Sequence, residues 1–281
     1  MRPQLPHVAL ALALLAGSSQ VPAIPGQAQA VLAQARAAIG GEERLQAVKS
    51  LSLKGLAGTA PTAFTNLQID FLLPDRFLIS RNRAYFRRVG GYNWKELIEQ
   101  RWQDGLRADV RPADPDSDAY AWQMAARRRE CARYLVAWLL MAPAEYGVQF
   151  TDDISGDKAD ARTDIVDAKG ANEMALRLFF DKTTHLLVKL TYREQVPTSP
   201  AVASRPEARP VGERGEPLFT DLKAPEAKST EVTMEFSEHH ADDGIVFPHK
   251  VRIDAQGLQE EWQISRFRVN PPLDAKDFER K

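Results

Sequence analysis

Hydrophobic and polar residues alternate along the last fifty residues of the chain. Val232, Met234 and Phe236 are separated by polar residues, and the alternation returns over residues 245–254 and 258–269. Side chains on a strand point to opposite faces in turn, so this pattern predicts antiparallel strands with one dry and one wet face. Asp243-Gly244, between the first two segments, has the chemistry of a tight hairpin turn. A three-stranded meander is therefore expected here.

The same alternation occurs earlier in the chain. It covers residues 174–180 and 186–192, which we expect to form a hairpin, and residues 51–58, 66–73 and 76–83. Further strands are expected near 85–88, 148–152 and 163–167 and over 94–110, with a turn at Gly90-Gly91. A break in parity after Ile264 predicts a bulge near Arg266. Together these segments predict about nine to eleven strands.

Residues 116–141 have the three- to four-residue periodicity of an amphipathic helix, with Tyr120 and Cys131 among its apolar positions. A polar residue among positions 116–118 can cap this helix, and Pro143 lies just beyond its end. Shorter helices are expected over 31–39 and 42–48, with Gly40-Gly41 between them.

These elements predict a mainly β protein of the α+β class. A single antiparallel sheet of this size must curl, and its dry face must be covered or must close around something. We therefore expect a large curled antiparallel sheet or unclosed β-barrel covered by α-helices. Residues 197–228 hold six of the eighteen prolines. Because the strands on both sides of them are alike, we interpret them as a mobile loop within one domain of residues 31–281.

The first thirty residues have the organisation of a cleavable signal peptide. Arg2 precedes a short apolar run over residues 8–16, and Ala28 and Ala30 are the small residues that a signal peptidase reads. The alternative, a buried helix, would require amphipathic spacing that this run lacks. We expect an exported, periplasmic protein without a lipid anchor, since no cysteine directly follows. The lone Cys131 is expected to be a small buried apolar group.

Composition and motifs narrow the function further. The 37 basic and 38 acidic residues give a net charge of −1, which gives no general case for nucleic-acid binding. No nucleotide-binding loop, nucleophile elbow or zinc-protease motif occurs, so we expect no enzyme, no catalytic residue and no cofactor. His239-His240 is interpreted as part of a solvated turn and not as a metal site, because adjacent histidines on a strand point opposite ways. A metal-dependent hydrolase centred on this pair remains the less favoured alternative.

Several short motifs resemble those of one bacterial family. They are Ala38-Ile39-Gly40-Gly41, Phe71-Leu72-Leu73-Pro74-Asp75-Arg76-Phe77, Asp243-Gly244-Ile245-Val246-Phe247-Pro248, Trp262-Gln263-Ile264, Val269-Asn270-Pro271-Pro272-Leu273-Asp274 and Asp277-Phe278. In these motifs and in the order of its elements, the chain resembles the LolA-like periplasmic proteins of the outer-membrane lipoprotein-sorting superfamily.

This resemblance implies an unclosed β-barrel whose helices cover a hydrophobic cavity. It also implies a non-enzymatic carrier or binder of lipid or lipoprotein acyl chains that can meet envelope membrane proteins. We expect it to be a monomer. The proline-rich segment departs from the lipoprotein carriers, and no residue matches a lipoprotein-docking site, so an apolar cavity is the firmer implication.

The expected ligand lies between the long helix and the dry face of the sheet. Strand parity and helix spacing assign its contacts to Phe71, Phe77, Arg81, Met124, Leu135, Trp138, Met234, Phe236 and Trp262. A buried Arg81 would need a partner. The alternative is that these side chains form the packed core of an envelope interaction or sensor module. The arginines over 76–88 and 127–133 could meet anionic lipid head groups, or they could belong to wet faces.

Overall fold

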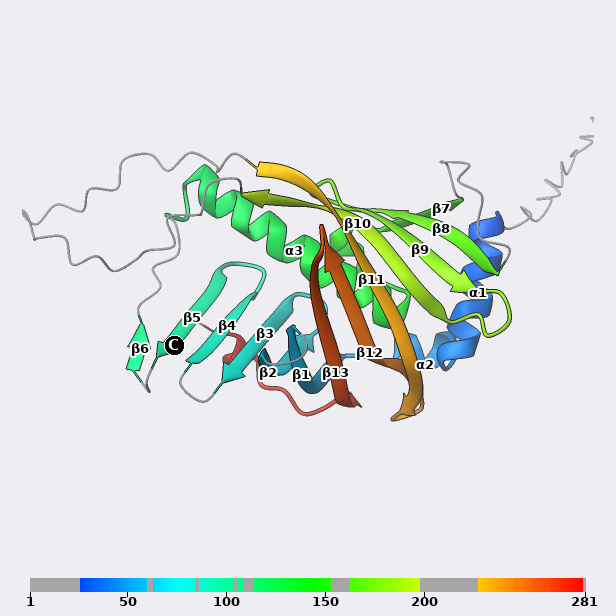
Figure 1. The fold of residues 1–281 in the computed structure, drawn as a ribbon, viewed down its shortest axis with the longest axis horizontal. Coiled ribbons are helices and arrows are strands. Elements are labelled where there is room, and N and C mark those ends of the chain that lie inside the picture. Colours follow the sequence, from blue (N-terminus) through cyan, green and yellow to red (C-terminus); the bar gives the residue numbers. More distant parts are fainter. Residues whose placement is uncertain are drawn as a thin grey trace, which may run out of the picture.

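A single antiparallel sheet of 13 strands forms the body of the protein (Figure 1). The computed structural model describes residues 26–59, 63–83, 86–103, 106–108, 114–152, 162–197 and 227–279. The strands of the first half are β1 (Ser50–Thr59), β2 (Ala63–Leu72), β3 (Arg76–Arg83), β4 (Phe86–Tyr92), β5 (Leu97–Gln103) and β6 (Leu106–Ala108). Those of the second half are β7 (Gln149–Asp152), β8 (Thr163–Lys169), β9 (Ala175–Asp181), β10 (Leu187–Pro197), β11 (Ala227–Asp242), β12 (Ile245–Ala255) and β13 (Leu258–Val269).

The first and last strands of the chain meet in the middle of the sheet. β1 pairs with β2 on one side and with β13 on the other, and the order continues outward through sequence neighbours to β6 and β7. Within the described residues these two edge strands do not pair with each other, so the sheet is unclosed. The predicted curled, unclosed antiparallel sheet is confirmed, with 13 strands where about nine to eleven were expected.

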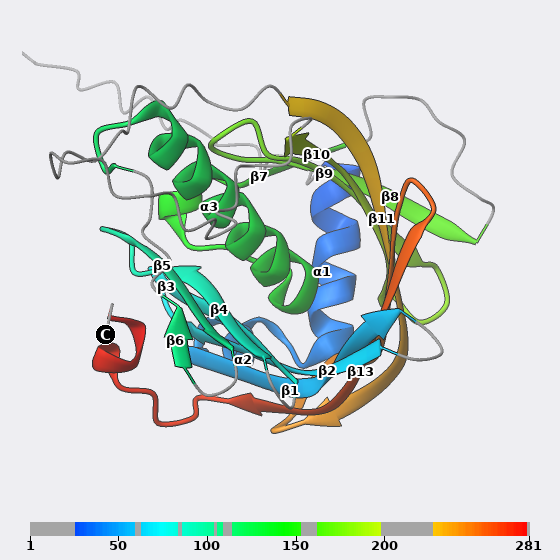
Figure 2. The same ribbon diagram turned by 60° about the vertical axis from the view of Figure 1, so that its left-hand side comes forward.

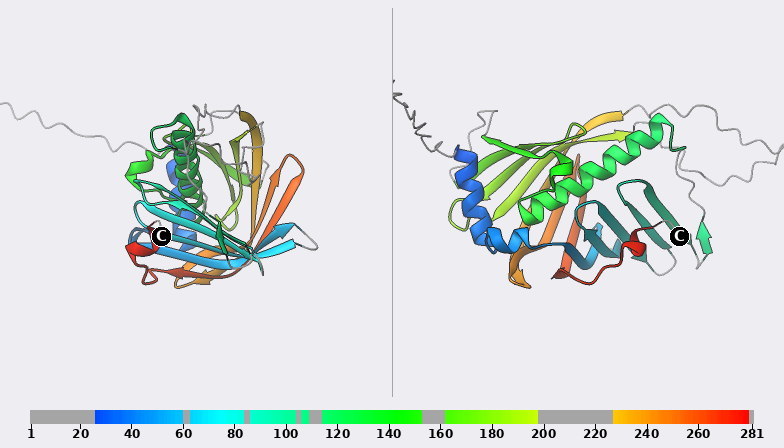
Figure 3. Two further views of the ribbon diagram at one scale, coloured as in Figure 1. Left: turned by 90° about the vertical axis from the view of Figure 1, so that its left-hand side faces the viewer. Right: turned by 180° about the vertical axis from the view of Figure 1, so that it is seen from behind.

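The long helix connects the two edges of the sheet. α3 (Asp118–Leu139) follows β6 and leads to β7 through the short helix η1 (Ala144–Tyr146), and it runs diagonally across the inside of the curl (Figure 2). α1 (Gln27–Ile39) lies beside β7 and β8, and α2 (Glu42–Gln46) leads into β1. The curled sheet therefore surrounds α1 and α3 (Figure 3).

The predicted long helix is confirmed, with its start fixed by a side chain. Ser117 is the N-cap, and its Oγ accepts a hydrogen bond from the backbone N–H of Tyr120 at 3.2 Å. The helix ends where Leu140 adopts a left-handed conformation with φ of 51°. The predicted bulge also lies close to its expected place: Lys54 faces Arg266 but Gly55 faces Ile264, which leaves Ser265 unpaired between them.

The predicted turn at Gly90-Gly91 is wrong, because both glycines lie inside β4. A Cβ atom on Gly91 would lie only 2.0 Å from the carbonyl oxygen of Phe77 on the neighbouring strand. Glycine is therefore needed here for close strand approach and not for a reversal of the chain. The reversal follows at residues 93–96, where the side chain of Asn93 accepts hydrogen bonds from the backbone of Lys95 and Glu96.

The predicted signal-peptide boundary at residue 30 falls within α1. The first turn of this helix includes Ala28, which is buried and whose backbone N–H donates to Asp152 Oδ1 at 2.6 Å. Residues 1–25, and residues 198–226 of the proline-rich segment, lie outside the described residues. The signal peptide, the single domain and the loop therefore stay predictions. None of the described helices is long and apolar enough to cross a membrane.

Two apolar clusters stabilise the sheet from opposite sides. The large one fills the inside of the curl, where the inward residues of β1, β2 and β9 to β13 meet α1 and α3. On the outside, the short C-terminal helix η2 (Ala275–Phe278) lies on β3 and its Phe278 is buried, and Val89 of β4 and Ile98 of β5 are also buried outside the inner cluster. The inner cluster is where the sequence predicts a ligand.

Candidate functional site

The predicted ligand-binding residues all lie on the inside of the curl. Phe71, Phe77, Met234, Phe236 and Trp262 project from the sheet, and Met124, Leu135 and Trp138 project from α3 toward it. These eight side chains are buried, while Arg81 is partly exposed near the end of β3.

An aromatic cluster joins the helix to the sheet. The Trp138 ring meets Phe71 edge-on, with the ring centres 5.7 Å apart, and it stacks on Tyr134 at 5.0 Å. Tyr134 also contacts Phe77 at 6.0 Å and Trp262 at 5.7 Å. Aromatic pairs at these distances stabilise a core beyond the area that they bury. Tyr134 is thus central to the predicted face although the helical spacing of the sequence did not single it out.

Among the described residues, the side chains inside the curl are buried and pack against one another. The internal cavity beside Trp138 measures about 10 Å³, which is close to the volume of one water-sized probe. Its lining includes Leu140 and, from the sheet, Leu187, His239 and Val246. Trp138 Nε1 is buried without a hydrogen-bond partner in the described part of the chain. An acyl chain could enter this region only if α3 and the sheet moved apart.

Charged pairs join the middle of α3 to the sheet. Arg127 donates to Glu99 of β5 at 2.5 Å and to Glu130 of its own helix at 2.7 Å. Arg133 donates to Glu194 of β10 at 3.2 Å. Burial opposes ionisation of Glu130, but Arg127 and Arg133 outweigh it and hold the pKa of this carboxyl below its usual value.

Arg81 finds the partner that its inward position requires. Its guanidinium pairs with the Glu260 carboxylate and lies 6.0 Å from the centre of the Trp262 ring. The Trp262 indole N–H also donates to Glu260, at 2.9 Å. The structure therefore brings Arg81 together with one predicted wall residue and with a carboxylate that sequence parity had not assigned to it.

Cys131 is buried, as expected, but it also takes part in a polar contact. Its Sγ lies 3.2 Å from the Tyr146 hydroxyl, which in turn contacts the Tyr92 hydroxyl. Burial raises the pKa of the Cys131 thiol to about 12. The thiolate, which is the nucleophilic form, is therefore strongly disfavoured at neutral pH.

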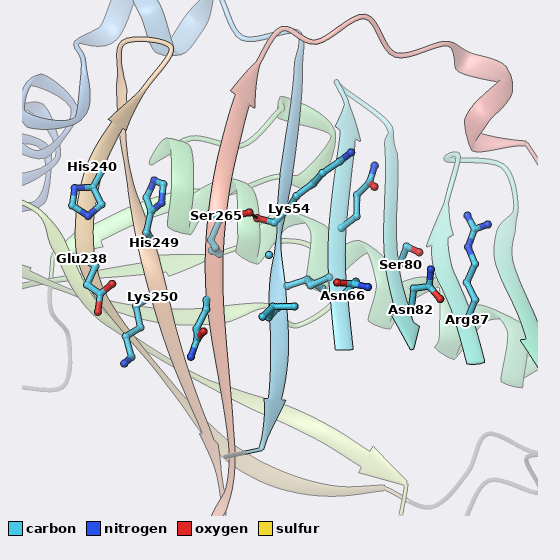
Figure 4. A pocket seen from close by; sticks show the side chains of 16 residues that line it. Lys54, Asn66, Ser80, Asn82, Arg87, Glu238, His240, His249, Lys250 and Ser265 are labelled. Atoms are coloured by element: carbon cyan, nitrogen blue, oxygen red, sulfur yellow. Dashed lines mark hydrogen bonds between the residues drawn. The ribbon is translucent and has the colours of Figure 1, made fainter. Parts of the chain in front are cut away.

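The opposite, outer face of the sheet carries an open groove of about 770 Å³ (Figure 4). Most of the residues that line it have polar side chains, including Lys54, Asn82, Arg87 and Lys250. Leu56 also lines it and is 39% exposed. These residues alternate along the strands with the inward residues of the core, so the groove and the aromatic cluster are two sides of one sheet.

The two adjacent histidines point to different surroundings. His239 Nε2 lies 3.2 Å from the carbonyl oxygen of Leu187, and burial is the main cause of its lowered pKa. His240 packs edge-on against His249 at the rim of the groove, and His249 Nε2 lies 3.0 Å from Asp242 Oδ2. Among the described residues, no group of three or more potential ligands could hold a metal ion.

Comparison with known proteins gives similarity only at the level of fold. No protein-family model and no curated protein matches the chain. A LolA superfamily protein from Nitrosomonas europaea aligns with a TM-score of 0.44 at 10% identity, over 90% of this chain and 97% of that one. A DUF1329 family protein from Desulfovibrio piger gives 0.43 at 13% identity, over 90% and 97%. A proposed outer membrane lipoprotein-sorting protein domain from Vibrio parahaemolyticus gives 0.43 at 10% identity, over 88% and 94%.

These alignments span most of both chains, but their TM-scores are low. A LolA superfamily protein, the kind of protein that the sequence motifs resemble, is among the aligned structures. With so few identical residues, the alignments assign no role to any side chain of this chain.

Proposed function

We propose that this chain is a non-enzymatic, periplasmic binding or carrier protein that holds an acyl chain or a lipid between the curled sheet and α3. The observation that carries the proposal is the aromatic surface shared by the two elements, in which Phe71, Phe77 and Trp262 of the sheet meet Tyr134 and Trp138 of the helix. Each methylene group transferred from water to such a surface contributes about 0.8 kcal/mol.

The contacts between α3 and the sheet support the proposal that this helix can separate from the sheet. Its last two turns, with Leu135 and Trp138, are held by apolar contacts, but its middle is linked to the sheet by the pairs Arg127–Glu99 and Arg133–Glu194. Water can solvate both partners of such a pair when the helix moves away from the sheet. We propose that ligand entry begins with the opening of these two pairs.

Native purification followed by solvent extraction and mass spectrometry tests the proposal, together with titration of a fluorescent acyl probe. We expect co-purified lipid or saturable probe binding. Trp262→Leu, inside the curl, should weaken probe binding several-fold, while Leu56→Ala in the outer groove should leave it unchanged. Absence of both lipid and probe binding would refute the proposal.

A second function is favoured by one observation, the filled interior. If the 10 Å³ cavity is all the space that ever forms, the same fold serves as an envelope interaction or sensor module. Hydrogen exchange separates the two proposals. A separating helix predicts that α3 amides exchange faster than those of β1 and β13, through partial opening. A permanently packed module predicts equal protection, and a protein partner captured by crosslinking in cells.

A further inference from the structure

Three arginines stand in direct register across three neighbouring strands. Arg81 of β3 faces Arg88 of β4, and Arg88 faces Arg101 of β5. All three lie on the inner face of the sheet. On each strand, the arginine is the inward neighbour of a residue in the adjacent row, which consists of Ile79, Gly90 and Glu99. Like charges directly opposite each other destabilise a sheet. An arginine row of this kind therefore calls for a compensating anion.

The carboxylates nearby do not neutralise the row. Arg81 pairs with Glu260, but the Arg88 guanidinium reaches Glu99 only at 3.7 Å. Glu99 is already engaged by Arg127 of α3 at 2.5 Å. Arg101 has no ion-pair partner among the residues that the structure describes, and its Nε is buried without a hydrogen bond. Among the residues that the structure describes, the row therefore has guanidinium donors without partners and more positive than negative charge.

The backbone beside the row is shaped to admit a guanidinium. A Cβ atom on Gly90 would lie 2.6 Å from Arg127 Nη2, so the missing side chain leaves the space that Arg127 occupies. Arg127 of α3 and Arg88 share the carboxylate of Glu99, so Arg127 adds a fourth positive group beside the middle of the row. The Arg88 side chain is 46% exposed, so an anion can reach it from solvent.

The arginine row also borders the aromatic surface. Arg81 lies 6.0 Å from the Trp262 ring, and on the same face of β3 the next inward residues are Ile79 and Phe77. Successive residues on one face of a strand are about 7 Å apart. A molecule with an apolar tail against Phe77 and Trp262 could therefore place a charged group at the row without leaving the inner face.

We propose that Arg81, Arg88 and Arg101 bind the anionic head group of an amphiphile, a phosphate or carboxylate, whose apolar tail enters the region between the sheet and α3. This inference rests on the proposed function and names the class of its ligand. Guanidinium groups suit this task because they donate pairs of hydrogen bonds to phosphate and carboxylate oxygens.

Titration with four amphiphiles of one chain length tests the inference by displacement of the acyl probe, below their micelle concentrations. Dodecyl phosphate and dodecanoate carry anionic heads, dodecyl maltoside is neutral and dodecyltrimethylammonium is cationic. We expect both anions to bind about tenfold or more tightly than the maltoside, because a hydrogen bond to a charged group contributes at least that factor to an equilibrium constant. The double variant Arg88→Gln with Arg101→Gln should lose this preference and keep the affinity for the maltoside.

Arg87→Gln is the matched control, since Arg87 lies on the same strand but lines the outer groove (Figure 4). It should leave the anion preference intact, and thermal unfolding should show that all variants fold. The inference is overturned if the wild type does not prefer the anionic amphiphiles, or if the double variant keeps that preference. The proposed function still stands in that case, provided that dodecyl maltoside binds. If none of the four amphiphiles displaces the probe or binds, the proposed function fails as well.

Two further comparisons show whether the anion is free phosphate or a lipid head group, and whether that head group is a phosphate or a carboxylate. Inorganic phosphate alone should bind far more weakly than dodecyl phosphate, and equal affinities would overturn the assignment to a lipid head group. A larger loss for dodecyl phosphate than for dodecanoate in the double variant would assign the row to phosphate, and the reverse would assign it to a fatty-acid carboxylate.

Discussion

The two faces of the same strands offer two different hollows. The inner face is aromatic and its cavity is about 10 Å³, whereas the outer face bears a polar groove of about 770 Å³. Along β2 the alternation is direct: Ile69 and Phe71 are buried inside, while Asn66 and Gln68 line the groove. The open volume therefore lies on one side of the sheet, and the aromatic surface lies on the other.

This difference shows that the size of a hollow does not identify an apolar binding site. Burial of apolar surface supplies about 25 cal/mol per Å². Among the described residues that line the groove, Leu56 is the one large hydrophobic residue whose side chain is well exposed to solvent. The inner face has far more apolar area, but α3 covers it. The outer groove is accessible yet can offer an acyl chain little.

The largest effect should come from emptying the inner face. Trp138→Ala removes the ring that contacts Phe71, Tyr134 and Phe267, and we expect it to lower the free energy of unfolding by about 3–5 kcal/mol. Leu56→Ala in the outer groove should lower it by less than about 1 kcal/mol. Urea denaturation of both variants measures the two values. Similar losses would show that the two faces do not differ as described.

A smaller effect should come from the charged residues in the middle of α3. The pKa of Glu130 is lowered in the folded protein, so its ionised form contributes stability that is present above its unfolded value of about 4.5 and is lost as the pH falls through the lower folded value. Glu130→Gln should therefore lower stability by about 1–3 kcal/mol at neutral pH and flatten the acid limb of the stability curve. An unchanged acid limb would contradict this role.

Asp70, on the outer side of β2, should respond in the opposite direction. Burial raises the pKa of its carboxyl despite hydrogen bonds from Ser52 and Gln68. The ionised form is thus disfavoured by folding, and this destabilisation disappears as the pH falls through the raised folded value. Asp70→Asn should be at least as stable as the wild type at pH 7 and lose that advantage at pH 3. Guanidinium unfolding at the two pH values tests the sign.

The smallest effect is expected at the polar groove. Lys54→Ala removes a charge that directly faces Arg266 across the β1–β13 pair, so the unfolding free energy should change by no more than about 0.5 kcal/mol. Acyl-probe affinity should not change. A clear loss of probe binding in this variant would place the apolar ligand outside the curl and reverse the comparison of the two faces.

Much of the architecture could be predicted because it depends on the local periodicity of hydrophobic and polar residues. The alternation around Met234, Leu178 and Phe71 assigned these residues to the inner face, and the spacing around Trp138 placed it on the covering side of α3. The turn expected at Gly90-Gly91 failed because glycine marks both reversals and close strand contacts. Only the position of the Phe77 carbonyl distinguishes these cases.

The candidate site was predictable only in part. Parity assigned Arg81 to the inside, but it could not identify Glu260 as its partner, since 179 residues separate them. Tyr134 was missed, and the pairing of Arg127 with Glu99 was not predicted, for a related reason. On a helix inside a curl, several sides meet the sheet, so a single apolar stripe does not describe what the helix contacts.

The sequence by itself determined which side of each strand is dry, where the long helix begins and that the sheet must curl. These properties depend on neighbours a few residues apart. The tertiary structure decided that β1 pairs with β13, that α3 fills the curl and that Arg81, Arg88 and Arg101 stand in one row. These depend on register and packing between distant segments, which local periodicity does not specify.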